Sequence, residues 1–184
     1  PYVIGDTKST TVEDANPSPL TAMGVLRSIE GAAQFHLNKD SVEGLHVAIQ
    51  GAGSVAYYLS KLLHERGARI TVCDPHPEAA QRIADECQAN VVDISAIYDV
   101  SCDIFSPCAL GGTITTSTMD RLQCRMIVGA ANNQLAHRDV INTIDSKGMI
   151  YVPDYLANSG GLIHAAMVYD YKDARRADEP IAKL

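Results

Sequence analysis

The chain has 184 residues, of which 46% are hydrophobic, and this predicts a single globular domain with an apolar core of ordinary size. Its net charge is −7 and its 15 lysines and arginines form no basic run, so it lacks the pattern typical of nucleic-acid or acidic-lipid partners. The sequence has no secretory signal and no apolar run of about 18 residues, so we expect a cytoplasmic protein with no membrane partner.

The first part of the chain, residues 1–18, is rich in Thr, Ser, Asp, Asn and Pro, which predicts an extended segment. Because the sequence starts with Pro1 rather than Met, we expect it to be part of a longer protein. Apolar periodicity then predicts a helix over residues 20–37, with Ser18 as its N-cap and Pro19 in its first position.

From residue 45 onward, β-rich apolar segments alternate with helical ones. Strands are expected at residues 45–50, 69–73, 90–92, 102–106, 125–128 and 149–152. Helices are expected at residues 55–65, 77–87, 116–122, 139–147 and 161–171, with a helical turn at 94–98. The alternation predicts an α/β domain over residues 19–171, with a doubly wound, Rossmann-type, mostly parallel sheet and helices on both faces. Residues 172–184 are charged without an apolar period, so we expect a flexible tail.

Five cysteines are scattered along the chain, with no C-x-x-C pair and no spacing typical of zinc ligands. We therefore expect free thiols in a reducing compartment and no metal site. The five are Cys73, Cys87, Cys102, Cys108 and Cys124.

The turn after the strand at residues 45–50 carries the pattern Gly51-x-Gly53-x-x-Ala56. Gly51 allows a tight turn, Gly53 allows a pyrophosphate to approach the backbone, and Ala56 allows the helix to pack closely on the strand. Asp74 ends the next strand about 20 residues on, where a carboxylate accepts hydrogen bonds from both ribose hydroxyls and repels a 2′-phosphate. The sequence therefore predicts binding of NAD in preference to NADP.

Plainer interpretations of these residues stay open. The two glycines would also suit a generic turn between a strand and a helix, and Asp74 would also suit a solvated turn before Pro75. His76, when charged, could tolerate a phosphate, so the exclusion of NADP is not complete.

Five segments resemble the glutamate/leucine/phenylalanine/valine dehydrogenase family, and most closely its leucine dehydrogenases. They are NPSPLTAMG at 16–24, GAGSVA at 51–56, CDIFSPCALGG at 102–112, GAANNQ at 129–134 and PDYLANSGG at 153–161. The resemblance covers most of residues 16–170. It implies the NAD-binding domain of an enzyme for the reversible, NAD-dependent oxidative deamination of an apolar L-amino acid, such as leucine, valine or phenylalanine, to its 2-oxo acid and ammonium.

The resemblance also implies roles for single residues. Cofactor contacts are implied for Thr21 at the nicotinamide carboxamide, Gly53, Ser54 and Val55 at the pyrophosphate, Asp74 at the adenosine ribose, Ala109 and Leu110 at the ribose groups, and Asn133 near the nicotinamide ribose. Substrate contacts are implied for Asn158, Leu162 and Ala165. Ser54 and Ser159 stand where the family usually has Asn and Ala, and neither change forbids binding.

The family's catalytic lysines belong to an N-terminal domain that is absent from this sequence, so we expect no catalytic residue here and no turnover by this chain alone. The full-length protein is expected to be a homo-oligomer whose small-molecule partners are an amino acid and its 2-oxo acid. Two alternatives stay open: an isolated dinucleotide-binding module without activity, and a nicotinamide-linked sensor or other Rossmann oxidoreductase.

Several of these residues also have a structural interpretation. The pair Asn132–Asn133 would suit hydrogen bonding to loop backbone, and Gly160–Gly161 a plain turn into a helix. His164 lies in an apolar helical segment and would suit simple packing. Cys108 has no base evident in the sequence, so we do not expect it to be a nucleophile.

Overall fold

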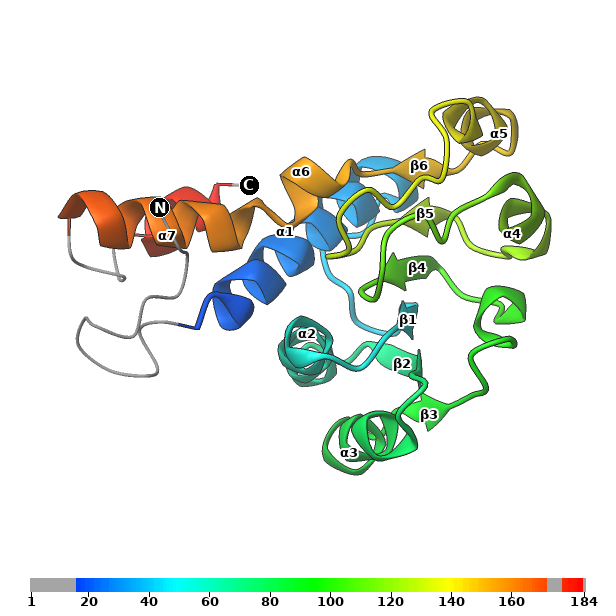
Figure 1. The fold of residues 1–184 in the computed structure, drawn as a ribbon, viewed down its shortest axis with the longest axis horizontal. Helices are drawn as coiled ribbons and strands as arrows, with labels where there is room; N and C mark the ends of the chain where they lie inside the picture. Colours follow the sequence, from blue (N-terminus) through cyan, green and yellow to red (C-terminus); the bar gives the residue numbers. More distant parts are fainter. Residues whose placement is uncertain (1–15, 172–176, 184) are drawn as a thin grey trace.

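The computed structural model describes residues 16–171 and 177–183 of the chain. A six-stranded, all-parallel sheet with the order β3-β2-β1-β4-β5-β6 forms its centre (Figure 1). The strands are β1 (His46–Gln50), β2 (Arg69–Cys73), β3 (Asn90–Val91), β4 (Ile104–Pro107), β5 (Met126–Ile127) and β6 (Ile150–Tyr151). This is the strand order of a dinucleotide-binding Rossmann domain, so the predicted fold class is confirmed.

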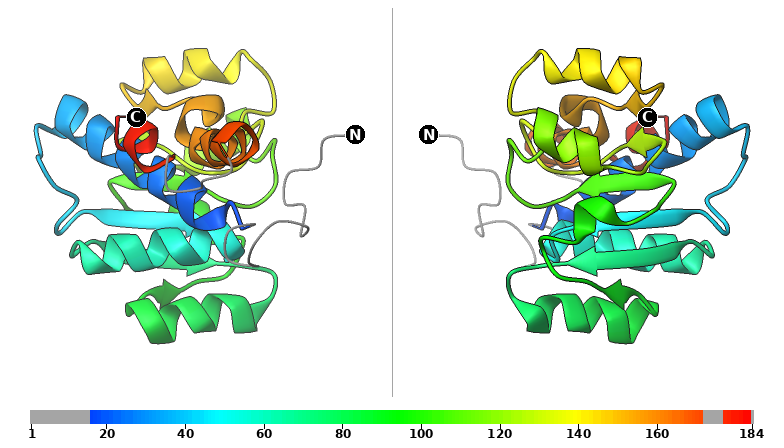
Figure 2. Two further views of the ribbon diagram at one scale, coloured as in Figure 1. Left: turned by 90° about the vertical axis from the view of Figure 1, so that its left-hand side faces the viewer. Right: turned by 90° about the vertical axis from the view of Figure 1, so that its right-hand side faces the viewer.

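Helices cover both faces of the sheet, as Figures 1 and 2 show. The long helices are α1 (Ser18–Leu37), α2 (Ser54–Glu65), α3 (Pro77–Cys87) and α7 (Ser159–Tyr171). The short ones are a 3₁₀ turn (Ile97–Asp99), α4 (Thr116–Arg121), α5 (Val140–Ser146), α6 (Asp154–Ala157) and α8 (Asp178–Ala182). Helices α1, α2 and α3 lie on one face, while α4, α5 and the 3₁₀ turn lie on the other (Figure 1).

Two apolar clusters fill the spaces between the sheet and these helix layers. The pleat of β1 divides its residues between them, because Val47 and Ile49 belong to the cluster under α1 and α2, whereas Ala48 belongs to the opposite one. Phe105 of β4 is fully buried in this second cluster. The central strands are therefore apolar on both sides, as expected for a parallel sheet covered on both faces.

The structure confirms β2 and α3 at their predicted bounds and moves the starts of others. Strand β4 begins at Ile104 rather than Cys102, because the N–H groups of both Arg125 and Met126 donate to the carbonyl of Asp103 and interrupt the regular ladder. Helix α1 begins at Ser18, one residue earlier than an N-cap assignment to Ser18 requires. The Ser18 N–H is instead satisfied by the Asn16 side chain at 3.0 Å.

Helix α8 differs from the flexible tail expected from the sequence. Ala177 and Ile181 are buried, and α8 packs against α1 and α7 (Figures 1 and 2). The two residues are spaced by one helical turn, which allows so short a helix to bury its apolar side. The rest of the expected tail (residues 172–176 and 184) and most of the expected extended segment (residues 1–15) lie outside the described residues.

Thr115 caps α4 through a reciprocal pair of bonds and supports a stability prediction. Its hydroxyl accepts the Thr118 N–H at 3.1 Å, while the Thr118 hydroxyl accepts the Thr115 N–H at 2.8 Å. Thr115→Ala should lower the free energy of unfolding by about 1 kcal/mol, measured by urea denaturation. Thr116→Ala, at an exposed position in the first turn of the same helix, is the control and should change it by less than about 0.5 kcal/mol. Equal losses for the two variants would contradict the capping role.

Candidate functional site

Gly51 forms the turn that follows β1 at the carboxyl edge of the sheet. Its φ of +100° lies in the region that favours glycine, and a Cβ there would lie 3.0 Å from the Ala109 Cβ and 3.1 Å from the Ala109 Cα. Its N–H donates to the Cys73 carbonyl at 2.8 Å. The predicted need for glycine at this turn is confirmed, and the loop after β4 contacts the turn directly.

Gly53 is the N-cap residue of α2, and no side chain of residues 16–171 or 177–183 caps that helix end. Its φ is −70°, and a Cβ added to it would meet no atom within 4 Å. Ala56, one turn into the helix, is fully buried against the sheet. The uncapped N–H groups of α2 therefore border open space, which is the arrangement that binds anions at helix N-termini.

The Asp74 carboxylate lies beside this loop, at the carboxyl end of β2. Its Oδ2 accepts the Ala52 N–H at 2.7 Å and its Oδ1 accepts the His76 N–H at 2.9 Å. Each oxygen keeps a second acceptor site, because a carboxylate offers about four in all. Asp74 is thus fixed in place by the loop rather than freely solvated, and it can still accept hydrogen bonds from a ligand.

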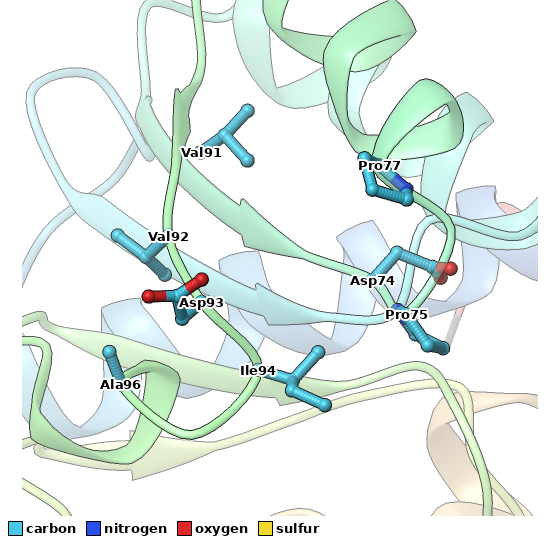
Figure 3. A pocket seen from close by; sticks show the side chains of 8 residues that line it. All are labelled: Asp74, Pro75, Pro77, Val91, Val92, Asp93, Ile94 and Ala96. Atoms are coloured by element: carbon cyan, nitrogen blue, oxygen red, sulfur yellow. The ribbon is translucent and has the colours of Figure 1, made fainter.

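A pocket of about 580 Å³ opens between the ends of β2 and β3 (Figure 3). Its lining consists of Asp74, Pro75, Pro77, Val91, Val92, Asp93, Ile94 and Ala96. Figure 3 shows Asp74, Pro75 and Pro77 on one side and Val91, Val92 and Asp93 on the other. Only Asp74 among them was predicted as a site residue. Val91, Val92, Ile94 and Ala96 lie at or after the end of β3, and the strand order brings them to the same edge as Asp74.

The loops after β4 and β5 form the neighbouring part of the same edge. The Gly112 N–H donates to the Asn133 carbonyl at 2.7 Å, and the Ala131 N–H donates to the Pro107 carbonyl at 2.9 Å. Gly111 packs so closely on Asn132 that a side chain would overlap the Asn132 carbonyl. The predicted residues Ala109 and Asn133 are therefore connected: Ala109 contacts the Gly51 turn, and the loop that contains Ala109 is hydrogen-bonded to Asn133. Leu110 is 81% exposed on this surface.

Asp154 in α6 and Asn158, the residue that ends this helix, both bind the loop after β5. The Asn158 Nδ2 donates to the Ala130 carbonyl at 3.1 Å and to the Asn132 Oδ1 at 2.6 Å. The Asp154 Oδ2 accepts the N–H of Asn133, and its Oδ1 accepts the Tyr155 N–H at 2.9 Å. The Asn132 side chain therefore bonds to a side chain rather than to loop backbone, and the backbone of the β5 loop is held by Asp154 and Asn158 instead.

Helices α1 and α7 cross closely beside α6. Gly160 faces the Leu20 carbonyl, and Gly161 faces the Thr21 hydroxyl, with no room for a Cβ at either position. The Thr21 hydroxyl donates to the Pro17 carbonyl at 2.9 Å. The glycine pair lies within α7 rather than in a turn before it, and helix packing requires both residues. It brings the predicted residue Thr21 next to the start of α7.

Along α7, Leu162 is 66% exposed and Ala165 is half-buried. His164 is buried on the same helix, as the packing interpretation expects. The candidate substrate residues Leu162 and Ala165 therefore retain solvent-accessible surface on α7.

Cys108 lies in the β4 loop, close to the candidate site. Burial raises the pKa of its thiol, although the Ser106 hydroxyl at 3.5 Å and the Ala130 backbone act in the opposite direction. A thiol with a raised pKa holds little thiolate near neutral pH, which agrees with the expectation that Cys108 is not a nucleophile. Among the described residues no group of three potential ligands could hold a metal ion. No helix in that part of the chain is long and apolar enough to cross a bilayer.

The chain matches the family model described as Glutamate/Leucine/Phenylalanine/Valine dehydrogenase over residues 17–77 and 74–176. The chain belongs to this family. The match spans the phosphate loop, Asp74, the β4 and β5 loops and the α6–α7 junction, so the predicted family membership is confirmed.

Individual relatives of the family agree with this assignment. A leucine dehydrogenase of Thermoactinomyces intermedius is 48% identical over 151 residues, covering 82% of this chain and 41% of the relative. A phenylalanine dehydrogenase of Lysinibacillus sphaericus is 38% identical over 151 residues, covering 79% and 40%. The crystal structure of L-tryptophan dehydrogenase from Nostoc punctiforme matches with a TM-score of 0.88 at 35% identity, covering 92% of this chain and 52% of that one. The chain spans about two fifths of the length of the two curated relatives.

Proposed function

We propose that this chain is the NAD-binding domain of an amino-acid dehydrogenase that reversibly deaminates an apolar L-amino acid, such as leucine, valine or phenylalanine, to its 2-oxo acid and ammonium. One observation carries the cofactor part of this proposal. The carboxylate of Asp74 is fixed by the Ala52 N–H at 2.7 Å, beside the uncapped N-terminus of α2 at Gly53.

The residues present fit a dinucleotide. The open space over Gly53 and the free N–H groups at the start of α2 would hold the pyrophosphate, with Ser54 and Val55 contributing backbone N–H groups. The dipole of a twelve-residue helix adds attraction for the negative charge. Because the net charge of the chain is −7, its overall field does not attract a pyrophosphate. The local field at the start of α2 provides this attraction instead.

The pocket between β2 and β3 would receive the adenosine half. Its prolines and aliphatic side chains offer apolar surface to a purine ring, with the Asp93 carboxylate beside them, and Asp74 would accept hydrogen bonds from the ribose hydroxyls. A 2′-phosphate would meet the Asp74 charge at close range, so we infer a preference for NAD.

The nicotinamide half would lie over β4 and β5, because a dinucleotide crosses a Rossmann sheet between its two halves at β1 and β4. Ala109, Leu110 and Asn133 occupy that side, and Thr21 lies at the α1–α7 crossing against Gly161. When bound, NAD supplies the hydride acceptor for oxidation of the substrate α-carbon. The share of this chain is to orient the nicotinamide and to exclude water from it.

On the substrate side, we infer that Asn158 orients the amino acid and that Leu162 and Ala165 contact its apolar side chain. Asn158 suits this role because two hydrogen bonds fix its amide nitrogen and thus the direction of its side chain. The general acid–base groups would come from the part of the relatives that this chain does not span. We also infer that the full-length protein is a homo-oligomer.

A two-step experiment tests this function. Calorimetry of the chain should show saturable binding of NAD and binding of NADP that is weaker by about tenfold or more, because the ribose bonds to Asp74 are replaced by charge repulsion. A chimera that joins the N-terminal portion of the T. intermedius leucine dehydrogenase to this chain should then form NADH when leucine is added. Failure to bind NAD would overturn the cofactor assignment. A chimera that is folded and binds NAD but turns over none of leucine, valine and phenylalanine would overturn the substrate class.

A further inference from the structure

The nicotinamide side of the site contains a charged residue to which no role has been assigned. Asp154 lies at the start of α6, soon after β6. In the sequence, α5 and β6 separate it from the β5 loop. Its side chain nevertheless bridges back to that loop, since Oδ2 accepts the N–H of Asn133. The two residues are 21 positions apart, so the contact is tertiary rather than local.

Asn133 is held in an unusual backbone conformation at this contact. Its φ is +52°, in the left-handed region where residues other than glycine are uncommon. The Asp154 carboxylate is the acceptor of the Asn133 N–H. The carbonyl of the same residue accepts the Gly112 N–H at 2.7 Å. Asn133 is therefore fixed from both sides, by α6 and by the β4 loop.

Both oxygens of Asp154 are used in this arrangement. Oδ2 receives the Asn133 N–H and Oδ1 receives the Tyr155 N–H at 2.9 Å. The two backbone donors bond to different oxygens, and a carboxylate has two acceptor oxygens whereas an amide has only one. The charge also reaches the end of β6: burial first, and then the nearby Asp154 carboxylate, raises the pKa of Tyr151.

We propose that Asp154 is a positioning residue for the nicotinamide half of the cofactor, acting through the backbone of Asn133. This inference rests on the proposed function, which places the nicotinamide ribose beside Asn133. Asp154 itself does not contact the cofactor. It holds the β5 loop in the left-handed conformation that directs the Asn133 side chain toward the ligand, and loss of this restraint lowers the population of the competent loop.

The test compares ligands that include or lack the nicotinamide half. In the full chain, Asp154→Asn should weaken NAD binding by about tenfold, because one backbone N–H loses a charged acceptor. Binding of ADP, which has only the adenosine and diphosphate portions, should change by less than about twofold, since Asp74 and Gly53 are untouched. Calorimetry with NAD and with ADP gives both values.

Asp103 offers a matched control at the opposite edge of the sheet. Its Oδ2 accepts the backbone N–H of His46 at 2.9 Å, so Asp103→Asn also removes a carboxylate that accepts a main-chain N–H. It should lower the unfolding midpoint in urea as Asp154→Asn does, but leave the ratio of NAD to ADP affinity unchanged. A role in stability alone would make the two variants behave alike.

A double variant tests the route of the effect. If Asp154 acts through Asn133, then Asp154→Asn introduced into Asn133→Gly should weaken NAD binding by no more than about twofold beyond Asn133→Gly alone. Additive losses, or equal losses of NAD and ADP affinity in Asp154→Asn, would overturn the positioning role. Failure of the unmodified chain to bind NAD while it binds ADP would instead overturn the proposed function, and this inference with it.

Discussion

Asp74→Asn is expected to reduce the affinity of the chain for NAD by about 10- to 100-fold, which corresponds to the loss of charged hydrogen bonds worth about 1.5–3 kcal/mol. The amide keeps the size of the side chain but has one acceptor oxygen. That oxygen has to serve the Ala52 and His76 N–H groups before it can serve a ribose. NADP should lose less affinity or gain some, because the negative charge that opposes its 2′-phosphate is gone.

The measurement is calorimetric titration of both cofactors into the parent chain and the variant at one ionic strength, because phosphate contacts depend on salt. Asp85→Asn provides the control for net charge. Asp85 lies on the exposed face of α3, where its Oδ1 accepts the Gln81 Nε2 at 2.8 Å. This variant should leave both affinities within about twofold. Parallel losses of NAD and NADP affinity in Asp74→Asn would indicate that Asp74 only supports the loop and does not recognise the ribose.

The two glycines of the phosphate loop should separate stability from binding. Gly51→Ala is expected to lower the free energy of unfolding by about 1–3 kcal/mol or more, because alanine at a φ of +100° is strained and its Cβ meets Ala109 at 3.0 Å. Gly53→Ala should cost about 1 kcal/mol or less, the difference between a glycine and an alanine N-cap, since its φ is −70° and the added Cβ meets nothing within 4 Å.

Gly53→Ala should have a large effect on NAD affinity although its effect on stability is small. The methyl group of Gly53→Ala would occupy the open space that the pyrophosphate requires, so NAD affinity should fall more than about tenfold in a protein that unfolds almost normally. Urea denaturation and NAD titration on the same samples give the two quantities. If Gly53→Ala binds NAD as the parent chain does, the pyrophosphate does not pass over Gly53 and the placement of the cofactor has to be revised.

Sequence patterns predicted the regular part of this domain well because the relevant information is local. The bounds of β2 and α3 follow from a β-branched run that ends at Asp74 and from Pro77 at a helix start. The starts of β4 and β5 were predicted two residues and one residue too early. There the carbonyl of Asp103 receives two N–H groups from the neighbouring strand, and this depends on a partner more than 20 residues away. Helix α8 was missed because its stability comes from packing on α1 and α7 rather than from its own pattern.

The same difference between local and long-range information applies to the candidate site. Gly51, Gly53 and Asp74 were predicted from their spacing, and the geometry at Gly51 agrees with the tight turn expected there. The pocket residues Val91, Val92, Ile94 and Ala96 and the contact between Asp154 and Asn133 were not predicted. Both arise from segments that become neighbours only once the strand order is known, and nothing in the residue types themselves marks them. The ligand contacts inferred from the family resemblance stay predictions for the titrations above.

The two outermost strands of the sheet, β3 and β6, are each only two residues long. A sheet margin normally presents a row of unpaired N–H and C=O groups onto which another chain can add a strand. Margins this short offer too few such groups for a stable ladder, so strand exchange and fibril-like stacking are disfavoured during synthesis and at high concentration. We therefore expect any self-association of the domain to use its helical surfaces and loops.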